Sequence, residues 1–333
     1  MPSDGMERPS DGVERELRDL LRAAFGEPPR QVTVASVRRR VVRRRAIEAV
    51  AGTAAVAALI SAAVPALGGV LGNASPSASP ARRAIAYVVN SQSDTVTPIR
   101  TATNTALPPV KTGLLPDAIA ITPDGKTAYV ANAASGTVTP IRTATDKALP
   151  PIKVGPHPQA IAVTPDGKTA YVVNNLSGTV TPIRTATNTA LPPVKVGHDP
   201  GAIAITPDGK TAYVTGTYPR FTVTPIQTAT NTVLPPVKVG RNPADIAITP
   251  DGKTAYVAST SGTVTPIRTA TNTALPPIKT GPGCNFIAIT PDGKTAYATD
   301  FNAGTVTPVR TATNTALPPV KVGRNPSEIA ITP

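Results

Sequence analysis

Hydrophobic positions recur with a strand-like period along most of the chain after residue 83. Segments such as Ala118–Pro123 (AIAITP) and Lys168–Asn174 (KTAYVVN) alternate apolar with small or polar residues and are rich in Ile, Val, Thr and Tyr. This composition, with a period of two, is typical of β-strands. The pattern predicts an all-β fold for residues 84–333.

One sequence unit is written six times in this region, and tyrosine marks its period. The marker residues are Tyr87, Tyr129, Tyr171, Tyr213, Tyr256 and Tyr297. Each unit holds four strand-like segments, and a Pro-Asp-Gly-Lys turn recurs at 123, 165, 207, 250 and 291. Asp-Gly between two strands is a strong hairpin signal because Gly adopts positive φ without a steric penalty. Four strands in a unit of about 42 residues predict a four-stranded antiparallel blade of a β-propeller.

Prolines occupy fixed positions in the third and fourth strands of the unit. The third-strand prolines are Pro98, Pro140, Pro182, Pro225, Pro266 and Pro308. Because an interior proline removes a donor from the ladder, we expect a β-bulge at each of them. The Pro-Pro pair of the fourth strand fits an outer edge, where proline prevents pairing with another molecule.

The two ends of the repeat region complement each other. The chain ends with Glu328–Pro333 (EIAITP), a first strand without a second, and the repeats begin at Ala84 with a second strand without a first. We therefore expect a six-bladed propeller whose first blade is completed by the C-terminal strand. A truncated seven-bladed ring is the alternative, but it leaves this match unexplained.

The repeat resembles a known family. The run AYVVNNLSGTVTPIRTATNTALPPVKVG, followed by AIAITPDGKTAYV, is similar to the YVTN-type β-propeller repeat of bacterial surface-layer and YncE-like proteins. The resemblance covers residues 84–333 and implies an extracytoplasmic propeller, often without known enzymatic activity. The third-strand prolines stand where the family commonly has Val. Arginines replace its common Asp at Arg100, Arg142, Arg184, Arg268 and Arg310. These departures concern the binding chemistry and not the fold.

The region before the repeats has the pattern of a membrane anchor. Residues 49–71 contain no charge over 23 positions, enough to cross a hydrocarbon core of about 30 Å. Six arginines at 38–45 precede it and place the N-terminal side in the cytoplasm. We expect a cytoplasmic tail at 1–45, a single transmembrane helix at 46–72, a Pro/Ser/Ala linker at 73–83 and a propeller outside the cell. The alternative is a cleaved signal peptide, although its n-region is normally much shorter.

Within the tail, residues 11–25 have the spacing of a short amphipathic helix. A helix of this length is marginal alone. It docks on a cytoplasmic partner or on the membrane surface, or it frays without a partner, and the sequence leaves both open.

Charge favours anionic partners. The formal net charge is +13, and the propeller repeats contribute +8, from 20 Lys or Arg and 12 Asp or Glu. We expect an anionic cell-wall polymer, a glycan or a protein as partner, in addition to the membrane, whereas nucleic acid is disfavoured. The sequence does not specify an oligomeric state.

The Pro-Asp-Gly-Lys turns lie on the face that the linker enters, here called the turn face. We expect this face to look toward the bilayer. Its lysines are Lys126, Lys168, Lys210, Lys253 and Lys294. They attract anionic lipid, or they are simply solvated because the turn aspartates offset their charge.

The opposite face, here called the variable face, carries the loops between second and third strands and the connections between blades. The repeats differ most there, so it is the candidate recognition surface. The candidate ligand-binding residues are Asp117, His157, Asp199, Tyr218, Arg220, Asp245, Asn285 and Asp300. With Tyr218, the residues Phe221, Phe286 and Phe301 form a ligand patch on this face or cover the end of the ring.

The sequence favours a binding or scaffold module without catalysis. His157, His198 and Asp199 make a poor metal site because the two histidines stand one position out of register. Cys284 replaces a repeat proline and is expected to be a small buried residue, not a nucleophile. We expect no metal and no cofactor. The alternative is a lyase or lactonase-type enzyme with a polar site on the variable face.

Overall fold

The structure is a computed structural model that describes residues 84–218 and 221–332. Within these ranges no helix is long and apolar enough to cross a membrane. The expected transmembrane helix at 46–72, the tail with its amphipathic helix at 1–45 and the linker at 73–83 lie outside the described residues.

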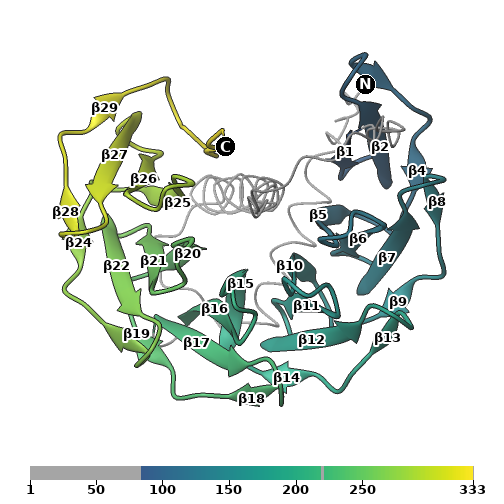
Figure 1. Ribbon diagram of the computed structural model, residues 1–333, viewed down its shortest axis with the longest axis horizontal. Helices are drawn as coiled ribbons and strands as arrows, with labels where there is room; N and C mark the ends of the chain where they lie inside the picture. Colours follow the sequence, from purple (N-terminus) through teal and green to yellow (C-terminus); the bar gives the residue numbers. More distant parts are fainter. Residues whose placement is uncertain (1–83, 219–220, 333) are drawn as a thin grey trace, which may run out of the picture. The chain divides into compact units, whose positions relative to one another are not determined.

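Six antiparallel sheets follow one another in chain order and are called blades 1 to 6 (Figure 1). Blade 1 contains β1 (Ile85–Asn90), β2 (Thr95–Arg100), β3 (Thr105–Ala106) and β4 (Val110–Lys111). Blade 2 contains β5 (Pro116–Ile121), β6 (Thr127–Asn132), β7 (Thr137–Arg142), β8 (Lys147–Ala148) and β9 (Ile152–Lys153). Blade 3 contains β10 (Pro158–Val163), β11 (Thr169–Asn174), β12 (Thr179–Arg184), β13 (Thr189–Ala190) and β14 (Val194–Lys195).

The remaining blades have the same make-up. Blade 4 contains β15 (His198–Ile205), β16 (Thr211–Tyr218), β17 (Thr222–Gln227), β18 (Thr232–Val233) and β19 (Val237–Lys238). Blade 5 contains β20 (Pro243–Ile248), β21 (Thr254–Ser259), β22 (Thr263–Arg268), β23 (Thr273–Ala274) and β24 (Ile278–Lys279). Blade 6 contains β25 (Cys284–Ile289), β26 (Thr295–Asp300), β27 (Thr305–Arg310), β28 (Thr315–Ala316) and β29 (Val320–Lys321).

Blades 2 to 6 share one topology. The first strand pairs with the second and the second with the third, and two short segments on the third strand together make the fourth. In blade 2 these segments, β8 and β9, flank the Leu-Pro-Pro sequence at 149–151 that interrupts the fourth strand. Among the described residues, blade 1 has no first strand. The expected all-β fold of repeated four-stranded antiparallel sheets is confirmed, and six such units fit a six-bladed propeller.

The bulge expected at the third-strand prolines is absent from the third strand itself; the extra residue lies opposite it in the fourth strand, where residues 149–151 face only Thr139 and Pro140. Tyr129 pairs with Pro140 in an unbroken β6–β7 ladder, and the same Tyr–Pro pairing recurs in all six blades. The carbonyl of Pro140 accepts a hydrogen bond from the N–H of Leu149 at 2.8 Å, so the main chain of Pro140 faces the fourth strand. Its missing N–H therefore falls where Pro150 and Pro151 already interrupt the ladder.

Bulges also occur at the start of the first strand. The register shifts between Pro116 and Ala118 in β5, and it shifts at the same place in blades 3 to 6. This end of the strand adjoins the variable face. A bulge releases one residue from regular pairing, so the side chain at Asp117 and its counterparts are freed for other contacts.

The expected closing strand at Glu328–Pro333 is not formed either. Residues 327–332 contain no strand, and within the described part of the chain β1 pairs only with β2. Likeness to a first strand was not sufficient, because no hairpin turn joins this segment to β1. Blades 1 and 6 are the two ends of the series in Figure 1.

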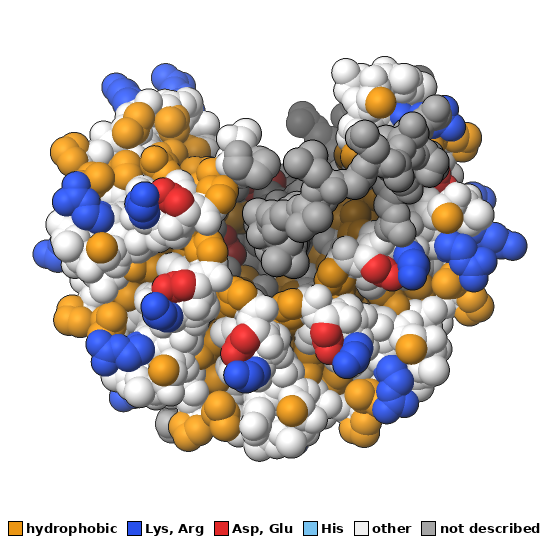
Figure 2. Space-filling model, viewed as in Figure 1, with side chains coloured by type: hydrophobic (Ala, Val, Ile, Leu, Met, Phe, Trp, Pro, Cys, Tyr) orange, Lys and Arg blue, Asp and Glu red, His pale blue; other side chains and the backbone are white. Residues whose placement is uncertain are grey.

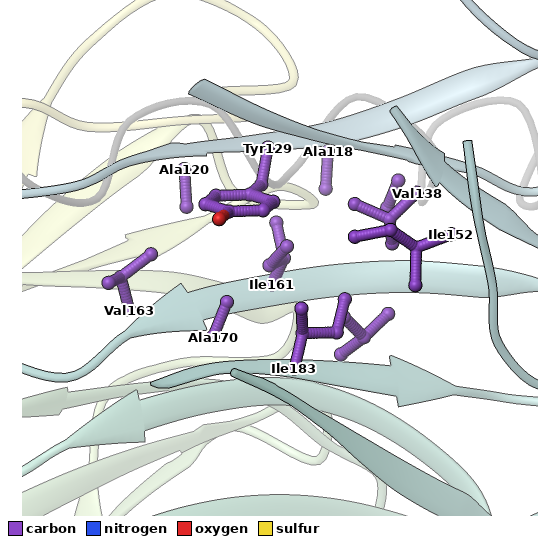
Figure 3. Close-up of a cluster of buried hydrophobic side chains, with 11 residues drawn as sticks. Ala118, Ala120, Tyr129, Val138, Ile152, Ile161, Val163, Ala170 and Ile183 are labelled. Atoms are coloured by element: carbon purple, nitrogen blue, oxygen red, sulfur yellow. The ribbon is translucent and has the colours of Figure 1, made fainter. Parts of the chain in front are cut away.

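The hydrophobic core lies between adjacent blades. Five clusters of buried side chains each join one blade to the next, from blades 1 and 2 to blades 5 and 6. Between blades 2 and 3, Tyr129 and Val138 meet Ile161 and Ile183 of the next blade (Figure 3). Each blade thus gains its stability from burying apolar surface against its neighbours, as in other repeat architectures.

A tyrosine hydroxyl links each of these blade pairs. Tyr129 donates to Oδ1 of Asn188, in the third-to-fourth-strand turn of the next blade, at 2.6 Å. The equivalent pairs, at 2.6–2.7 Å, are Tyr87–Asp146, Tyr171–Asn231, Tyr213–Asn272 and Tyr256–Asn314. Burial raises the pKa of Tyr129 to about 12, so its hydroxyl remains a donor at neutral pH.

Candidate binding surfaces

The turn face carries the same hairpin five times. In the turn between β5 and β6, Thr122 Oγ1 donates to Asp124 Oδ1 at 2.7 Å, and the N–H of Lys126 donates to the same oxygen at 3.0 Å. These two hydrogen bonds lower the pKa of Asp124. Gly125 completes the turn with φ +69°. The aspartate therefore shapes the turn and keeps its negative charge.

The predicted turn-face lysines each contact the aspartate of their own turn. The pairs, with Nζ–Oδ2 distances of 3.2–3.6 Å, are Lys126–Asp124, Lys168–Asp166, Lys210–Asp208, Lys253–Asp251 and Lys294–Asp292. Figure 2 shows adjacent acidic and basic side chains over successive blades. Such exposed pairs add little stability, but here they cancel the lysine charge. The positive charge left on this face comes from the repeat arginines.

These arginines end the third strands of five blades and are exposed. They are Arg100, Arg142, Arg184, Arg268 and Arg310. Blade 4 has Gln227 in the same register, opposite Thr211. The turn face therefore presents a ring of guanidinium groups with one natural neutral replacement.

A second ring of basic side chains lies at the variable face, here called the lysine rim. It consists of Lys111, Lys153, Lys195, Lys238, Lys279 and Lys321. Each ends the fourth strand and pairs with the first residue of the third strand, as Lys153 does with Thr137. All six are exposed, and no salt bridge involves them within residues 84–218 and 221–332. The signal for this rim was the lysine in each PVK or PIK sequence, which the sequence analysis did not single out.

Asparagines at the ends of second strands hold the loops of the variable face in blades 1 to 3. Asn174 donates from Nδ2 to Thr179 and Thr181 at 3.1 and 2.9 Å. Its Oδ1 accepts the N–H of Gly155 at 3.1 Å, which fixes the connection from blade 2. The counterparts in blades 4 to 6 are Gly216, Ser259 and Asp300. The variable face is thus supported differently in its two halves.

Asp117 is a buried carboxyl group on β5, in the bulge that adjoins the variable face. It is 9% exposed. Burial raises the pKa of Asp117 to about 7, because an ionised carboxylate loses its hydration there. No hydrogen bond to its carboxyl group occurs within the described part of the chain. This group can exchange a proton near neutral pH.

Asp245 connects blades 5 and 6. Its Oδ1 accepts the N–H of Ile246 at 2.8 Å, and its Oδ2 accepts the N–H of Ile287 at 3.0 Å. Burial raises the pKa of Asp245 to about 6, against the lowering effect of these N–H groups and with a further rise from the charge of Glu328. Asp245 is therefore placed to join two first strands, and a ligand would have to compete with those bonds.

Asp300 and Cys284 are paired across β25 and β26. Asp300 Oδ1 accepts the N–H groups of Asn302 and Ala303 at 3.0 and 2.9 Å, whereas its buried Oδ2 has no partner in the described residues. Cys284 is fully buried, and burial raises its pKa to about 11. The expectation of a small buried cysteine is confirmed.

The other predicted site residues are spread over the variable face. His157, in the connection to blade 3, has φ +55°, and its buried Nδ1 lacks a hydrogen-bond partner within the described residues. Asp199 is exposed on β15, and Asn285 is half-buried on β25. Tyr218 ends β16, but its side chain and Arg220 lie outside the described residues.

The structure gathers some of these residues and not others. Asp245 and Asp300 both act electrostatically on Cys284, and Glu328 acts on Asp245, so these groups share the region of blades 5 and 6. Asp117 and His157 belong to other blades. Arg241 lies over the ring of Phe221, 5.9 Å from the ring centre, which gives that aromatic residue a cation–π partner. No group of three or more His, Cys, Asp or Glu residues in the described ranges is arranged to hold a metal ion.

This fold and these surfaces define a repeat-built β-propeller with basic groups on both faces. A family model described as YncE-like beta-propeller matches residues 42–166, which confirms the resemblance seen in the sequence over residues 84–166. No curated protein matches the chain.

Two solved structures share the fold. Hydrazine synthase of Kuenenia stuttgartiensis superposes with a TM-score of 0.63 at 23% identity, covering 73% of this chain and 85% of that one. A functionally unknown protein from Desulfotomaculum acetoxidans DSM 771 gives a TM-score of 0.62 at 21% identity, covering 69% and 77%. At these identities the likeness concerns the fold alone.

Proposed function

We propose that this protein is a membrane-anchored, extracytoplasmic β-propeller that acts as a binding or scaffold module at the cell surface, without catalysis. Its partner is an anionic cell-wall polymer, held at the variable face. The anchor is the transmembrane segment at 46–72, which contains the uncharged run 49–71, and the arginines before it keep the N-terminus in the cytoplasm. The turn face then looks toward the bilayer and the variable face away from it.

The lysine rim is the observation that carries this proposal. It places one exposed lysine per blade at the same edge, and these lysines have no carboxylate partners within the described ranges, unlike those of the turn face. Regularly spaced, unpaired ammonium groups attract a polymer with repeated negative charges through electrostatic complementarity. The differing side chains inside the rim, such as Asp199 and Asn285, supply the asymmetry that selects a ligand.

Co-sedimentation with an insoluble anionic cell-wall polymer tests the proposal. The full chain, purified in mild detergent, is mixed with walls that carry a phosphate-rich polymer and with walls stripped of it. Binding to the first, weakened at least tenfold between about 50 and 500 mM salt, is expected because salt screens exposed charges. Equal binding to both kinds of wall, or binding to neither, contradicts the proposal.

A propeller lyase or lactonase is the second candidate, favoured by the pKa of about 7 at Asp117 and of about 6 at Asp245. Carboxyl groups that titrate near neutral pH are suited to general acid–base chemistry. Metal analysis of the purified chain separates the classes. Stoichiometric Ca²⁺ or Zn²⁺ would favour the enzyme, since such propeller enzymes often hold a metal at the channel mouth.

A further inference from the structure

A groove of about 340 Å³ lies between the fourth strand of blade 1 and the outer part of blade 2. One side is formed by Lys111, Thr112 and Gly113, at and just after the end of β4, and the other side includes Thr137 and Thr139 of β7. Lys111 is the blade 1 member of the lysine rim, so the groove adjoins that rim. Ligand sites measure about 300 Å³ or more, so this groove is large enough for a single sugar unit.

The groove is lined by a threonine at a position where most blades have a valine. Thr112 follows the rim lysine of blade 1. Blade 5 shares the threonine, and the other four blades have Val154, Val196, Val239 and Val322. Three of these valines, Val154, Val196 and Val239, pack in the hydrophobic clusters between blades. Thr112 places a hydroxyl group at this position instead, which makes the wall of the groove polar.

Asn132 leaves hydrogen-bonding capacity unused beside the groove. Its Nδ2 donates to Oγ1 of Thr137 and of Thr139 at 3.1 and 2.9 Å, so both hydroxyl groups act as acceptors and can donate their own hydrogens to a ligand. Asn132 is fully buried, and its Oδ1 has no partner within the described residues. In blade 3 the corresponding oxygen, on Asn174, accepts the N–H of Gly155. A buried acceptor without a donor is unfavourable, and a ligand hydroxyl would satisfy it.

The remaining walls of the groove are apolar or formed by close backbone approach. Leu149 and Pro151 of blade 2 provide the apolar surface. A Cβ on Gly113 would lie 2.6 Å from Ser135 Oγ and 2.9 Å from Asn132 Cγ, so glycine keeps this end of the groove open. Asp94, an acidic residue of the same blade connection, is held by the N–H of Leu115 at 2.8 Å and does not line the groove.

We propose that this groove is a subsite for one sugar unit that carries a phosphate or carboxylate group. The apolar face of the sugar ring packs on Leu149 and Pro151, and the ring hydroxyls bond to the two threonines of β7 and to Asn132 Oδ1. The negative group pairs with the ammonium group of Lys111. The inference rests on the proposed function for the source of the sugar, a repeating unit of the wall polymer, and it names what is recognised beyond charge.

Ligand-observed NMR with the full chain tests the subsite, in a detergent that contains neither sugar nor phosphate. The probes are glucose 1-phosphate, glucuronic acid, glucose and inorganic phosphate. We expect at least one charged sugar to bind about fivefold or more tightly than both glucose and inorganic phosphate, because it alone uses the apolar wall, the hydroxyls and the lysine together. Inorganic phosphate that binds as tightly as glucose 1-phosphate and glucuronic acid would overturn the proposal, since only charge would then be read.

Three variants locate the binding. Thr112→Val introduces the residue that four blades carry at this position, so the fold tolerates it, and it should weaken binding of the charged sugar about fivefold or more. Lys111→Gln should weaken it to a similar extent. Lys238→Gln removes the same charge from the rim at blade 4 and should change binding by no more than about twofold. Equal effects of the two lysine substitutions, or no effect of Thr112→Val, would contradict the subsite.

Binding of the same variants to phosphate-rich walls separates the subsite from the proposed function. If the wild-type chain binds these walls but no charged sugar prefers the groove, the subsite is wrong and the proposed function stands. If a charged sugar binds and Thr112→Val weakens it, but the wild-type chain does not bind the walls, the subsite stands and the proposed partner is wrong.

Discussion

Asp117 is a buried residue beside the variable face whose charge changes near neutral pH. Its folded-state pKa of about 7 lies above the ordinary value of 3.8, so the folded chain holds this proton more tightly than the unfolded chain does. Stability contributed by this group is therefore lost as pH rises from about 4 to 7. The physical cause is the free energy needed to bury the ionised Asp117 carboxylate away from water.

Asp117→Asn removes the free-energy cost of burying an ionised carboxylate at this position. We expect the variant to be more stable than the wild type by about 2–4 kcal/mol at pH 8 and nearly equal to it at pH 4. Urea unfolding at both pH values measures the difference. Asp199→Asn, at an exposed carboxylate on β15, is the control and should change little at either pH. An equal effect of Asp117→Asn at pH 4 and pH 8 would disprove the assigned cause.

Asn174 is expected to be a second sensitive position, because its side chain makes three hydrogen bonds in a buried site. Asn174→Ala leaves the N–H of Gly155 without an acceptor and should cost about 1–3 kcal/mol. Thermal or urea unfolding gives this value, with the exposed turn substitution Thr187→Ala as control. A loss no larger than that of the control would contradict the assigned role.

Contacts between residues were only partly predictable from the sequence. The burial of Cys284 followed from its place in the repeat. The tyrosine links did not, because each joins residues 58–60 positions apart and depends on how adjacent blades face each other. The nearly constant spacing from each tyrosine to the turn asparagine or aspartate of the next unit was the available signal. The turn-face lysines are weaker candidates for binding anionic lipid than the sequence alone indicated, because each pairs with the aspartate of its own turn.

The third strand shows how a proline can occupy the interior of a β-strand. Its main chain faces the interrupted fourth strand, so Pro182→Val should change stability by no more than about 0.5 kcal/mol. Val180 lies in the same strand opposite Val194 of β14. Val180→Pro removes a ladder donor and should cost about 3 kcal/mol or more. Equal effects of the two substitutions, measured by urea unfolding, would refute this explanation.

Strands and turns were predicted correctly where residues close in sequence determine them. They were predicted incorrectly where the structure depends on pairing or packing with a distant part of the chain. The period, the strands and the Asp-Gly hairpins follow from residues close in sequence. The unbroken pairing of the third strand with the second depends on which neighbour its proline faces, and no local pattern marked the register shift at 116–118. The segment at 328–333 has the residues of a strand, but pairing needs a partner more than 200 residues away, which no local pattern specifies.

At the scale of the whole molecule, the anchor is tested by membrane topology. We expect the full chain, tagged at both ends, to stay with membranes after alkaline carbonate washing and to keep its N-terminal tag. Protease added to spheroplasts should remove the C-terminal tag only. Loss of the N-terminal tag during export would indicate a cleaved signal peptide instead.

The central claim is that recognition occurs at the variable face, and a pair of charge-matched variants tests it most directly. One variant replaces five lysines of the rim by Gln, at 111, 153, 195, 238 and 279. The other replaces five turn-face arginines by Gln, at 100, 142, 184, 268 and 310. Gln227 shows that Gln occurs naturally in this second register, and both variants lose five positive charges.

The measurement is the dissociation constant of each full-length variant for the anionic wall polymer at one salt concentration. The account predicts that the lysine variant binds about tenfold more weakly or worse, whereas the arginine variant stays within about twofold of the wild type. Equal losses in both variants would mean that only net charge matters. A larger loss in the arginine variant would place recognition on the turn face and contradict the account.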